Sequence, residues 1–268
     1  MSAVEVNLLD HSISVCEGLD KWIGSIKTKV ASRILENLTS NTDGLDRYIE
    51  CAEIQELPRT FICCSFYQKD INDALTRAGI FMGAGKGMQA GTLPKQSDFT
   101  LINYKKLVAG HNLPGPTLTE FFQAVEKADA AAKANPAEAA FAEKFMASKR
   151  VASLSGQFYV IGFSIQNVKD QRSVISHEIF HAYHFLNSEY RNTILKFWRD
   201  VVSNEDRTAI TNEIGRAYNV DDEGLVVDEF QAYLIQSRAE GDRMKNFVAK
   251  YRQPLMNELA KFNPVKIA

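Results

Sequence analysis

The chain has 268 residues, of which 45% are hydrophobic and 24% are charged, so it can bury a sizeable core. The formal net charge is −2, with Lys and Arg spread along the whole sequence, which argues against nucleic acid or an anionic membrane as a partner. The N-terminus lacks the basic start and apolar core of a signal peptide, and no later run is long enough to span a bilayer. We therefore expect a soluble protein that is cytoplasmic, or exported without a cleavable signal peptide.

Helix and strand patterns follow one another in the first part of the chain. Residues 18–38 carry apolar side chains at helical spacing, which predicts a surface helix with one buried face. Three segments bounded by turn residues are rich in β-formers and predict strands: 59–67, 98–108 and 156–165. Pro114 and Pro116 break the chain, and the Ala-rich segment 120–149 predicts two helices separated at 134–138.

From Ser173 onward the pattern is almost entirely helical. This order of elements predicts an α+β fold made of a single domain, residues 1–268. We expect an N-terminal helix-and-strand part over about 1–150 and a helical part over about 151–268.

The cysteines are Cys16, Cys51, Cys63 and Cys64. They show neither zinc-knuckle spacing nor the density of a disulfide scaffold. We expect reduced thiols, with the adjacent pair buried in the strand at 59–67. His11 and His111 lie in polar or Pro-rich segments, where we expect exposed side chains.

Three of the five histidines fall within the stretch SVISHEIFHAYHF, residues 173–185. His177, Glu178 and His181 stand there in the order H-E-x-x-H. Positions four apart lie on one face of a helix, so His177 and His181 can bind the same metal ion. Glu178 lies one residue round the helix, beside the open coordination position, where it can take a proton from water. The pattern predicts a Zn²⁺ site with its general base.

A third ligand is expected in a later helical stretch, 224–240, because catalytic zinc usually takes three protein ligands. Asp228 and Glu229 stand near the start of this stretch. We choose Glu229, which shares a helix face with Tyr233 and Gln236, whereas Asp228 is shorter and lies about 100° away.

Two neighbours of the motif bear on how the site works. His184 continues the histidine stripe, but a fourth protein ligand would close the site to water, so we expect a pocket wall or a partner behind the ligands. The strand expected within 156–165 precedes the motif helix, and we expect its edge to bind an extended peptide by β-addition.

The chain resembles the gluzincin metalloproteases in carrying HEIFH and, on a later helix, DEFQAYL. The long spacer and the E-F-x-A continuation are most similar to the catalytic domain of anthrax lethal factor, and SHEIFHAYH is similar to zinc proteases that bacteria inject into host cells. The resemblance implies a zincin-like fold, in which a twisted sheet packs on the active-site helix beside a C-terminal helical bundle. It implies the zinc ligands His177, His181 and Glu229 and the general base Glu178.

Two positions depart from the lethal-factor type. That type has a tyrosine shortly before the third ligand to hold the oxyanion, but Asp222 stands seven residues before Glu229 here, and the nearest upstream tyrosine is Tyr218. We take Tyr218 as the oxyanion donor, with Tyr190 and Tyr233 as alternatives. Such enzymes also place an acid four residues after the third ligand to orient a histidine. Since Tyr233 occupies that position, Tyr233 or Asp222 is the expected orienting residue.

The function expected from these features is zinc-dependent endopeptidase activity on a protein or peptide substrate. The resemblance adds the setting of a secreted or injected bacterial effector or toxin, acting in a reducing cytosol. Two alternatives stay open: a binding module with a zinc site and no protease activity, and a zinc hydrolase of non-peptide amides.

Overall fold

Five strands form one mixed sheet: β1 (Val4–Leu8), β2 (Arg47–Glu53), β3 (Thr60–Ser65), β4 (Gly110–Pro114) and β5 (Tyr159–Ser164). Their order across the sheet is β1-β2-β3-β5-β4. β1 runs parallel to β2 and β3 runs parallel to β5, whereas the β2–β3 and β4–β5 pairs are antiparallel. The computed structural model describes residues 4–8, 18, 21–29, 32, 47–83, 90–95, 110–165, 171–218, 220–236 and 244–262.

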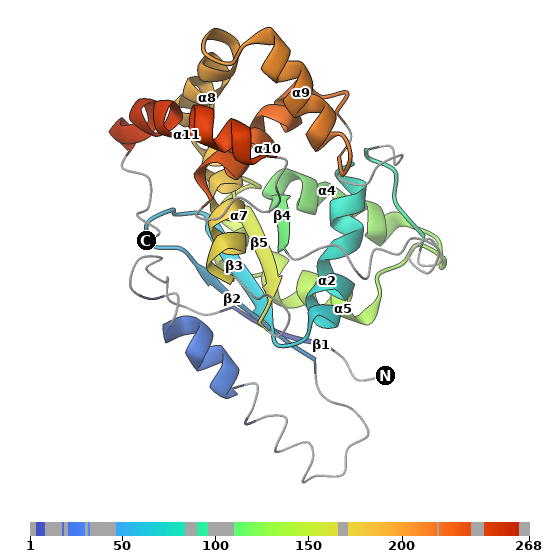
Figure 1. The fold of residues 1–268 in the computed structure, drawn as a ribbon. Coiled ribbons are helices and arrows are strands. Elements are labelled where there is room, and N and C mark those ends of the chain that lie inside the picture. The colour runs from blue at the N-terminus through green and yellow to red at the C-terminus, as the bar shows by residue number, and fades with distance from the viewer. Residues whose placement is uncertain are drawn as a thin grey trace.

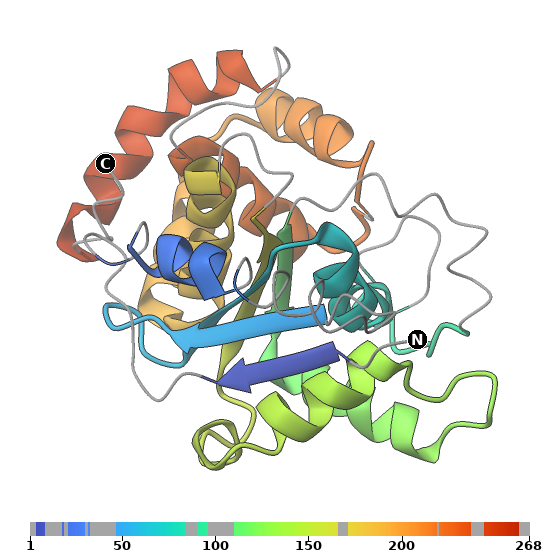
Figure 2. The same cartoon turned by 90° about the horizontal axis from the view of Figure 1, so that it is seen from below.

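Helices cover both faces of the sheet (Figure 1). One face is covered by α7 (Gln171–Leu186), α8 (Ser188–Asp200), α9 (Asn204–Ile214), α10 (Glu223–Ile235), α11 (Lys245–Leu259) and the short η3 (Ala260–Phe262). The opposite face is covered by α2 (Gln68–Phe81), α4 (Gly115–Lys127), α5 (Pro136–Phe141), η2 (Ala142–Met146) and α6 (Lys149–Ala152). Figure 2 shows the strands between these two groups of helices. The fold is therefore mixed α+β, as predicted.

The central strands are buried on both faces because helices lie on each side of them. Ile62 of β3 and Ile161 of β5 pack into the core beneath α7, whereas Phe61 and Val160 pack into the core beneath α2. Strands with two covered faces read as continuous apolar runs rather than as alternating patterns. This explains why the β-former runs at 59–67 and 156–165 predicted β3 and β5 correctly.

The predicted helices are also present. Residues 21–29, within the predicted helix 18–38, are helical and bury Trp22, Ile23 and Ile26 against the same core as α7. The Ala-rich segment contains the two expected helices as α4 and α5. The chain after Ser173 is mostly helical, as expected. Among the described residues, no helix combines the length and apolar character needed to cross a membrane.

Strand β4 was not predicted, and the strand expected at 98–108 lies outside the described residues. Two prolines at the end of β4 predicted a break in the chain, but both are compatible with the elements that the structure shows. Pro114 is the last residue of an end strand, and Pro116 lies in the first turn of α4, where a missing N–H is tolerated. His111, expected to be exposed, is instead buried in β4, with its Nε2 2.8 Å from Asn72 Oδ1. Burial lowers the pKa of His111 to about 4. His11 lies outside the described residues.

Two cysteines correct the expectation of reduced thiols. Cys51 of β2 stands directly opposite Cys63 of β3 in the antiparallel register, and the two form a buried disulfide. Cys64 is a free thiol buried on the opposite face of the sheet, whereas Cys16 lies outside the described residues. The burial of Cys63 and Cys64 was predicted, but the bond was not, because it depends on strand pairing rather than on a spacing motif.

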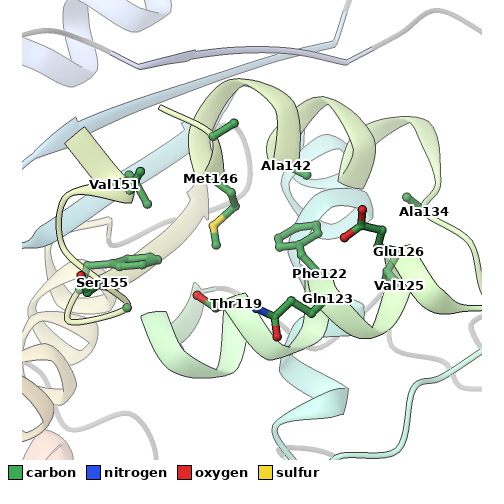
Figure 3. Close-up of a pocket in the computed structure, with 14 residues that line it drawn as sticks. Thr119, Phe122, Gln123, Val125, Glu126, Ala134, Ala142, Met146, Val151 and Ser155 are labelled. Carbon is green, nitrogen blue, oxygen red and sulfur yellow. The ribbon is translucent and has the colours of Figure 1, made fainter. Parts of the chain in front are cut away.

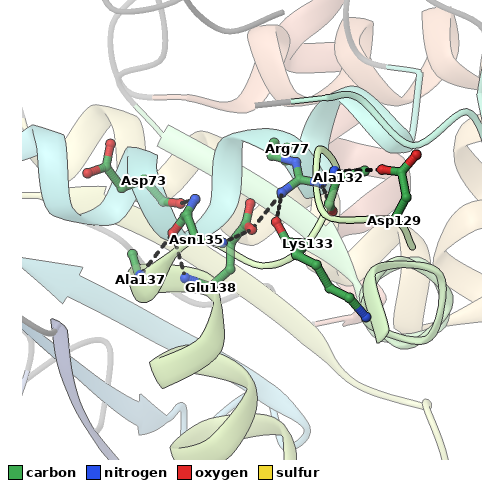
Figure 4. A network of polar contacts seen from close by, with 8 residues as sticks. All are labelled: Asp73, Arg77, Asp129, Ala132, Lys133, Asn135, Ala137 and Glu138. Atoms are coloured by element: carbon green, nitrogen blue, oxygen red, sulfur yellow. Dashed lines mark hydrogen bonds and ion pairs between the residues drawn. The ribbon is translucent and has the colours of Figure 1, made fainter. Parts of the chain in front are cut away.

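A buried ion pair connects α2 to the start of α5 (Figure 4). Arg77 Nη1 donates to Glu138 Oε2 over 2.8 Å, and its guanidinium also donates to two backbone carbonyls of the preceding loop. Asn135 caps α5 in a capping box with Glu138, and its Nδ2 donates to the carbonyl of Asp73. The polar groups of this loop are thus held by α2 rather than by solvent.

Candidate metal centre

Two histidines of α7 and one glutamate of α10 converge at the predicted site. The Nε2 atoms of His177 and His181 lie 3.1 Å apart. Glu229 Oε2 lies 3.5 Å from His177 Nε2, and Glu229 Oε1 lies 3.7 Å from His181 Nε2. One ligand atom from each of the three residues falls within 4.8 Å of the others. The structure thus brings the three predicted ligands together.

The cluster is held in place by packing behind it. Ile175, Ile179 and Ala182 anchor α7 in the core against the sheet. Val227 and Phe230 bury α10 in the same core, and α10 packs directly on α7. Because His177 and His181 are about one helical turn apart, fixing α7 places both rings on the same face of the helix, one above the other. The second helix then delivers Glu229 to that face.

The second ring nitrogen of each ligand histidine has its own polar partner. His177 Nδ1 lies 2.9 Å from Gln236 Oε1, and His181 Nδ1 lies 3.0 Å from Asp228 Oδ1. Burial lowers the pKa of His181, but Asp228 and Glu229 oppose this more strongly and raise it to about 10. In the neutral ring, an acceptor at Nδ1 holds the proton there, so that Nε2 can bind a metal ion.

These partners differ from the expected pair, Tyr233 and Asp222. Asp222 caps α10 by accepting from the N–H of Gly224, and Tyr233 packs its ring edge-on against the ring of His177. The sequence did contain a signal for Gln236, which stands two helical turns after Glu229 on the same face. Asp228 had been set aside as a ligand because it points away from Glu229, and that direction places it behind His181.

Glu178 is buried beside the cluster, against end strand β4. Burial raises the pKa of its carboxyl group, and a hydrogen bond from the Asn112 side chain opposes this rise. Its Oε2 has no hydrogen-bond partner among the described residues. Gly110 makes room for this carboxylate, since a Cβ at that position would stand 2.6 Å from Glu178 Oε1. Neither Gly110 nor Asn112 was predicted, because only the folded sheet places them near α7.

Of the candidate tyrosines, Tyr218 lies at the cluster beside Glu229, and Tyr233 packs against the ring of His177. The Tyr218 side chain hydrogen-bonds with Glu229, and the charge of Glu229 together with burial raises its pKa well above the usual value. It therefore stays protonated and can donate. Tyr190 is buried elsewhere in the core, where its hydroxyl donates to Gln231. His184 is not among the three clustered ligands, and its Nδ1 lies 3.4 Å from Asp228 Oδ1.

A separate pocket of about 570 Å³ lies on the opposite side of the sheet, between α4, α5, η2 and α6 (Figure 3). Phe122, Met146 and Phe158 give it an apolar lining, and Glu126 is its one titratable lining residue. Its lining contains no histidine or cysteine. The chemistry of the described residues is therefore concentrated at the cluster on α7 and α10.

The chain matches no protein-family model, no curated protein and no solved structure. What the cluster can do follows from its own donor atoms. Two imidazoles and one carboxylate are a common ligand set for catalytic zinc. Glu229 Oε2 is also buried without a hydrogen-bond partner among the described residues, as expected of an atom that awaits a cation. The residues present thus fit a zinc ion.

Proposed function

We propose that this protein is a zinc-dependent endopeptidase with a zincin-like fold. Zinc would be held by His177, His181 and Glu229, and Glu178 would act as general base. The observation that carries the proposal is the Glu178 carboxylate, which lies beside the three ligands with one buried oxygen unpartnered in the described structure. A purely structural zinc site has no need of such a group, so this feature supports an enzyme over a binding module.

The side chains divide the chemistry among them. A bound zinc ion would supply a Lewis acid that polarises the scissile carbonyl and lowers the pKa of water. Glu178 accepts the proton of the attacking water and returns it to the leaving amine, a task suited to a carboxyl group whose pKa is raised. Tyr218 donates its hydroxyl hydrogen to the developing oxyanion, and its raised pKa keeps that hydrogen in place.

The position of the base beside β4 supports an extended peptide as substrate. The expectation that β5 offers its edge is wrong, because β5 pairs with β3 on one side and with β4 on the other. In the described sheet β4 is the end strand, and its residues Gly110 and Asn112 adjoin Glu178. A peptide that pairs with the outer edge of β4 would therefore run past the general base.

The test combines elemental analysis with a peptide-cleavage assay by mass spectrometry, using unfolded casein as the probe substrate. We expect about one zinc per chain in the wild type, and loss of that zinc in a His177→Ala/His181→Ala double variant. Glu178→Gln should retain zinc but lose at least about a hundredfold in turnover, because an amide cannot accept the proton.

The matched control is Glu189→Gln on α8, whose side chain is 73% exposed, and it should cleave casein like the wild type. Wild-type turnover by Glu178→Gln, or full zinc content in the double histidine variant, would overturn the proposal.

A further inference from the structure

Asp228 occupies a junction behind the candidate metal centre. Its Oδ1 atom lies 3.0 Å from Nδ1 of the ligand His181 and 3.4 Å from Nδ1 of His184. It directly precedes the third ligand, Glu229, in α10. One carboxylate oxygen therefore contacts two histidines of α7 from the helix that also delivers the third ligand.

The hydrogen bonds of Asp228 extend away from the metal-binding atoms. Gln231 Nε2 donates to Asp228 Oδ1 over 3.1 Å, and the hydroxyl of Tyr190 donates to Gln231 Oε1 over 2.8 Å. Gln231 and Tyr190 are fully buried. The Asp228 carboxylate fixes which end of the Gln231 amide faces it, because an ionised carboxylate only accepts and so requires the amide nitrogen on its side; the amide oxygen then faces the Tyr190 hydroxyl, which donates to it. Three residues thus form a directed chain from α8 through α10 to His181.

The two ligand histidines have unequal partners. His177 meets the neutral amide oxygen of Gln236, whereas His181 meets a carboxylate. A carboxylate behind a ligating imidazole fixes the ring and its tautomer and makes the imidazole a stronger donor to the metal ion. A neutral amide fixes the ring but adds no charge.

We propose that Tyr190, Gln231 and Asp228 form a positioning chain that orients His181 and strengthens its binding of zinc. The proposal rests on the proposed zinc site and goes beyond it, because it assigns a role to residues that touch neither metal nor substrate. It also gives His184 a part, as a second contact that holds Asp228 in place. A chain that served only to pack the core would stabilise the fold without changing metal affinity.

The deciding measurement is the zinc affinity of metal-free protein, obtained by competition with a chromophoric chelator. Asp228→Asn keeps the shape of the side chain but removes its charge, and we expect its zinc affinity to fall by about tenfold to a hundredfold. Gln231→Leu leaves Asp228 unsupported and should lower the affinity by a smaller factor. Asp200→Asn, on the exposed C-terminal end of α8, is the matched control and should bind zinc like the wild type.

The outcomes separate this proposal from the proposed function. If the wild type binds no zinc, the metal centre itself fails. If the wild type binds zinc and a folded Asp228→Asn binds it equally tightly, the positioning chain is refuted and the metal centre stands. If Asp228→Asn does not fold, Gln231→Leu decides: weakened zinc binding supports the chain, and unchanged binding overturns it.

Discussion

The side chain of Asn112 hydrogen-bonds with the Glu178 carboxyl group beside the candidate metal centre. Its hydrogen bond holds the carboxylate, while Oε2 stays without a hydrogen-bond partner in the described part of the chain. The same bond lowers the pKa of Glu178 against the effect of burial. Burial raises the pKa of Glu178, whereas the charges of His177 and His181 lower it; the hydrogen bond from Asn112 adds a smaller lowering effect.

Replacing Asn112 with Ala should lower kcat/KM for casein cleavage by about tenfold and leave zinc content unchanged. The acid limb of the pH–rate profile should move to higher pH, because Glu178 loses the hydrogen bond that stabilises its charged form. Asn257→Ala, on the exposed face of α11, is the control with the same chemical change. An acid limb at the wild-type pH in Asn112→Ala would contradict the assigned role.

Some residues of the candidate site could be predicted from the sequence, whereas others are placed there only by the tertiary structure. The spacing of His177, Glu178 and His181 could be predicted, because helical periodicity alone sets their relative positions. Glu229 was also predictable, as the acid on the face of a second helix that offers room for a metal ion. Asn112 and Gly110 could not be predicted, since they reach Glu178 only through the pairing of β4 with β5 and the packing of α7 on that sheet.

Between elements, the contact of α2 with the start of α5 depends on a buried ion pair. Arg77 is 1% exposed and Glu138 is fully buried. Burial raises the pKa of Glu138 to about 7, and the guanidinium of Arg77 opposes this rise. The carboxylate also accepts the N–H of Asn135 in the capping box. Removing one charge would leave the other in the core with its desolvation uncompensated.

Arg77→Met should destabilise the protein by about 3–5 kcal/mol at pH 8, measured by urea unfolding. The loss should be smaller at pH 6. Without Arg77 the pKa of Glu138 rises further, so the folded variant binds a proton that the unfolded chain releases, and its stability falls as pH increases.

Two further variants test the cause. Arg77→Met/Glu138→Gln should regain part of the stability, because no buried charge is left alone. Lys69→Met, on the exposed face of the same helix, should change stability by no more than about 0.5 kcal/mol. A double variant less stable than Arg77→Met would show that the ion pair is not the cause.

The elements themselves were predictable where one local signal dominated. β3 and β5 are continuous apolar runs between turn residues, and α7 and α10 carry helical patterns. β4 could not be predicted, because a proline such as Pro114 usually indicates the end of a strand or helix. It is tolerated here because β4 lies at the end of the sheet. The disulfide between Cys51 and Cys63 could not be predicted either, because only the antiparallel register of β2 and β3 places the two cysteines opposite each other.

Across the whole molecule, the buried His111 makes the stability of the fold depend on pH. β4 directs Asn112 to the metal centre and His111 to the opposite face, where α2 covers it and Asn72 faces its Nε2. His111 is buried without a carboxylate partner among the described residues, and burial lowers its pKa from 6.5 to about 4. Between those values the unfolded chain binds a proton that the folded protein does not, so stability falls as pH decreases through this window.

We expect this histidine to make the folded state about 2 kcal/mol less stable at pH 5 than at pH 7.5. His111→Gln retains a donor for Asn72 but does not titrate. The pH dependence of its unfolding free energy should therefore be weaker than that of the wild type by this amount, measured by urea titration at both values in metal-free protein. Parallel curves for the two proteins would refute the assignment.

The short β4 strand also limits what the molecule can bind along its edge. The unpaired N–H and C=O groups of an edge strand can pair with any extended chain, including the same strand of a second copy of the protein. With five residues and a proline at its end, β4 offers only a short row of backbone groups to any partner strand. Hydrogen bonds to the backbone of so short a strand recognise an extended chain but distinguish little between amino-acid sequences. If the protein binds peptides as we propose, the choice among them would then come from side chains beyond the strand.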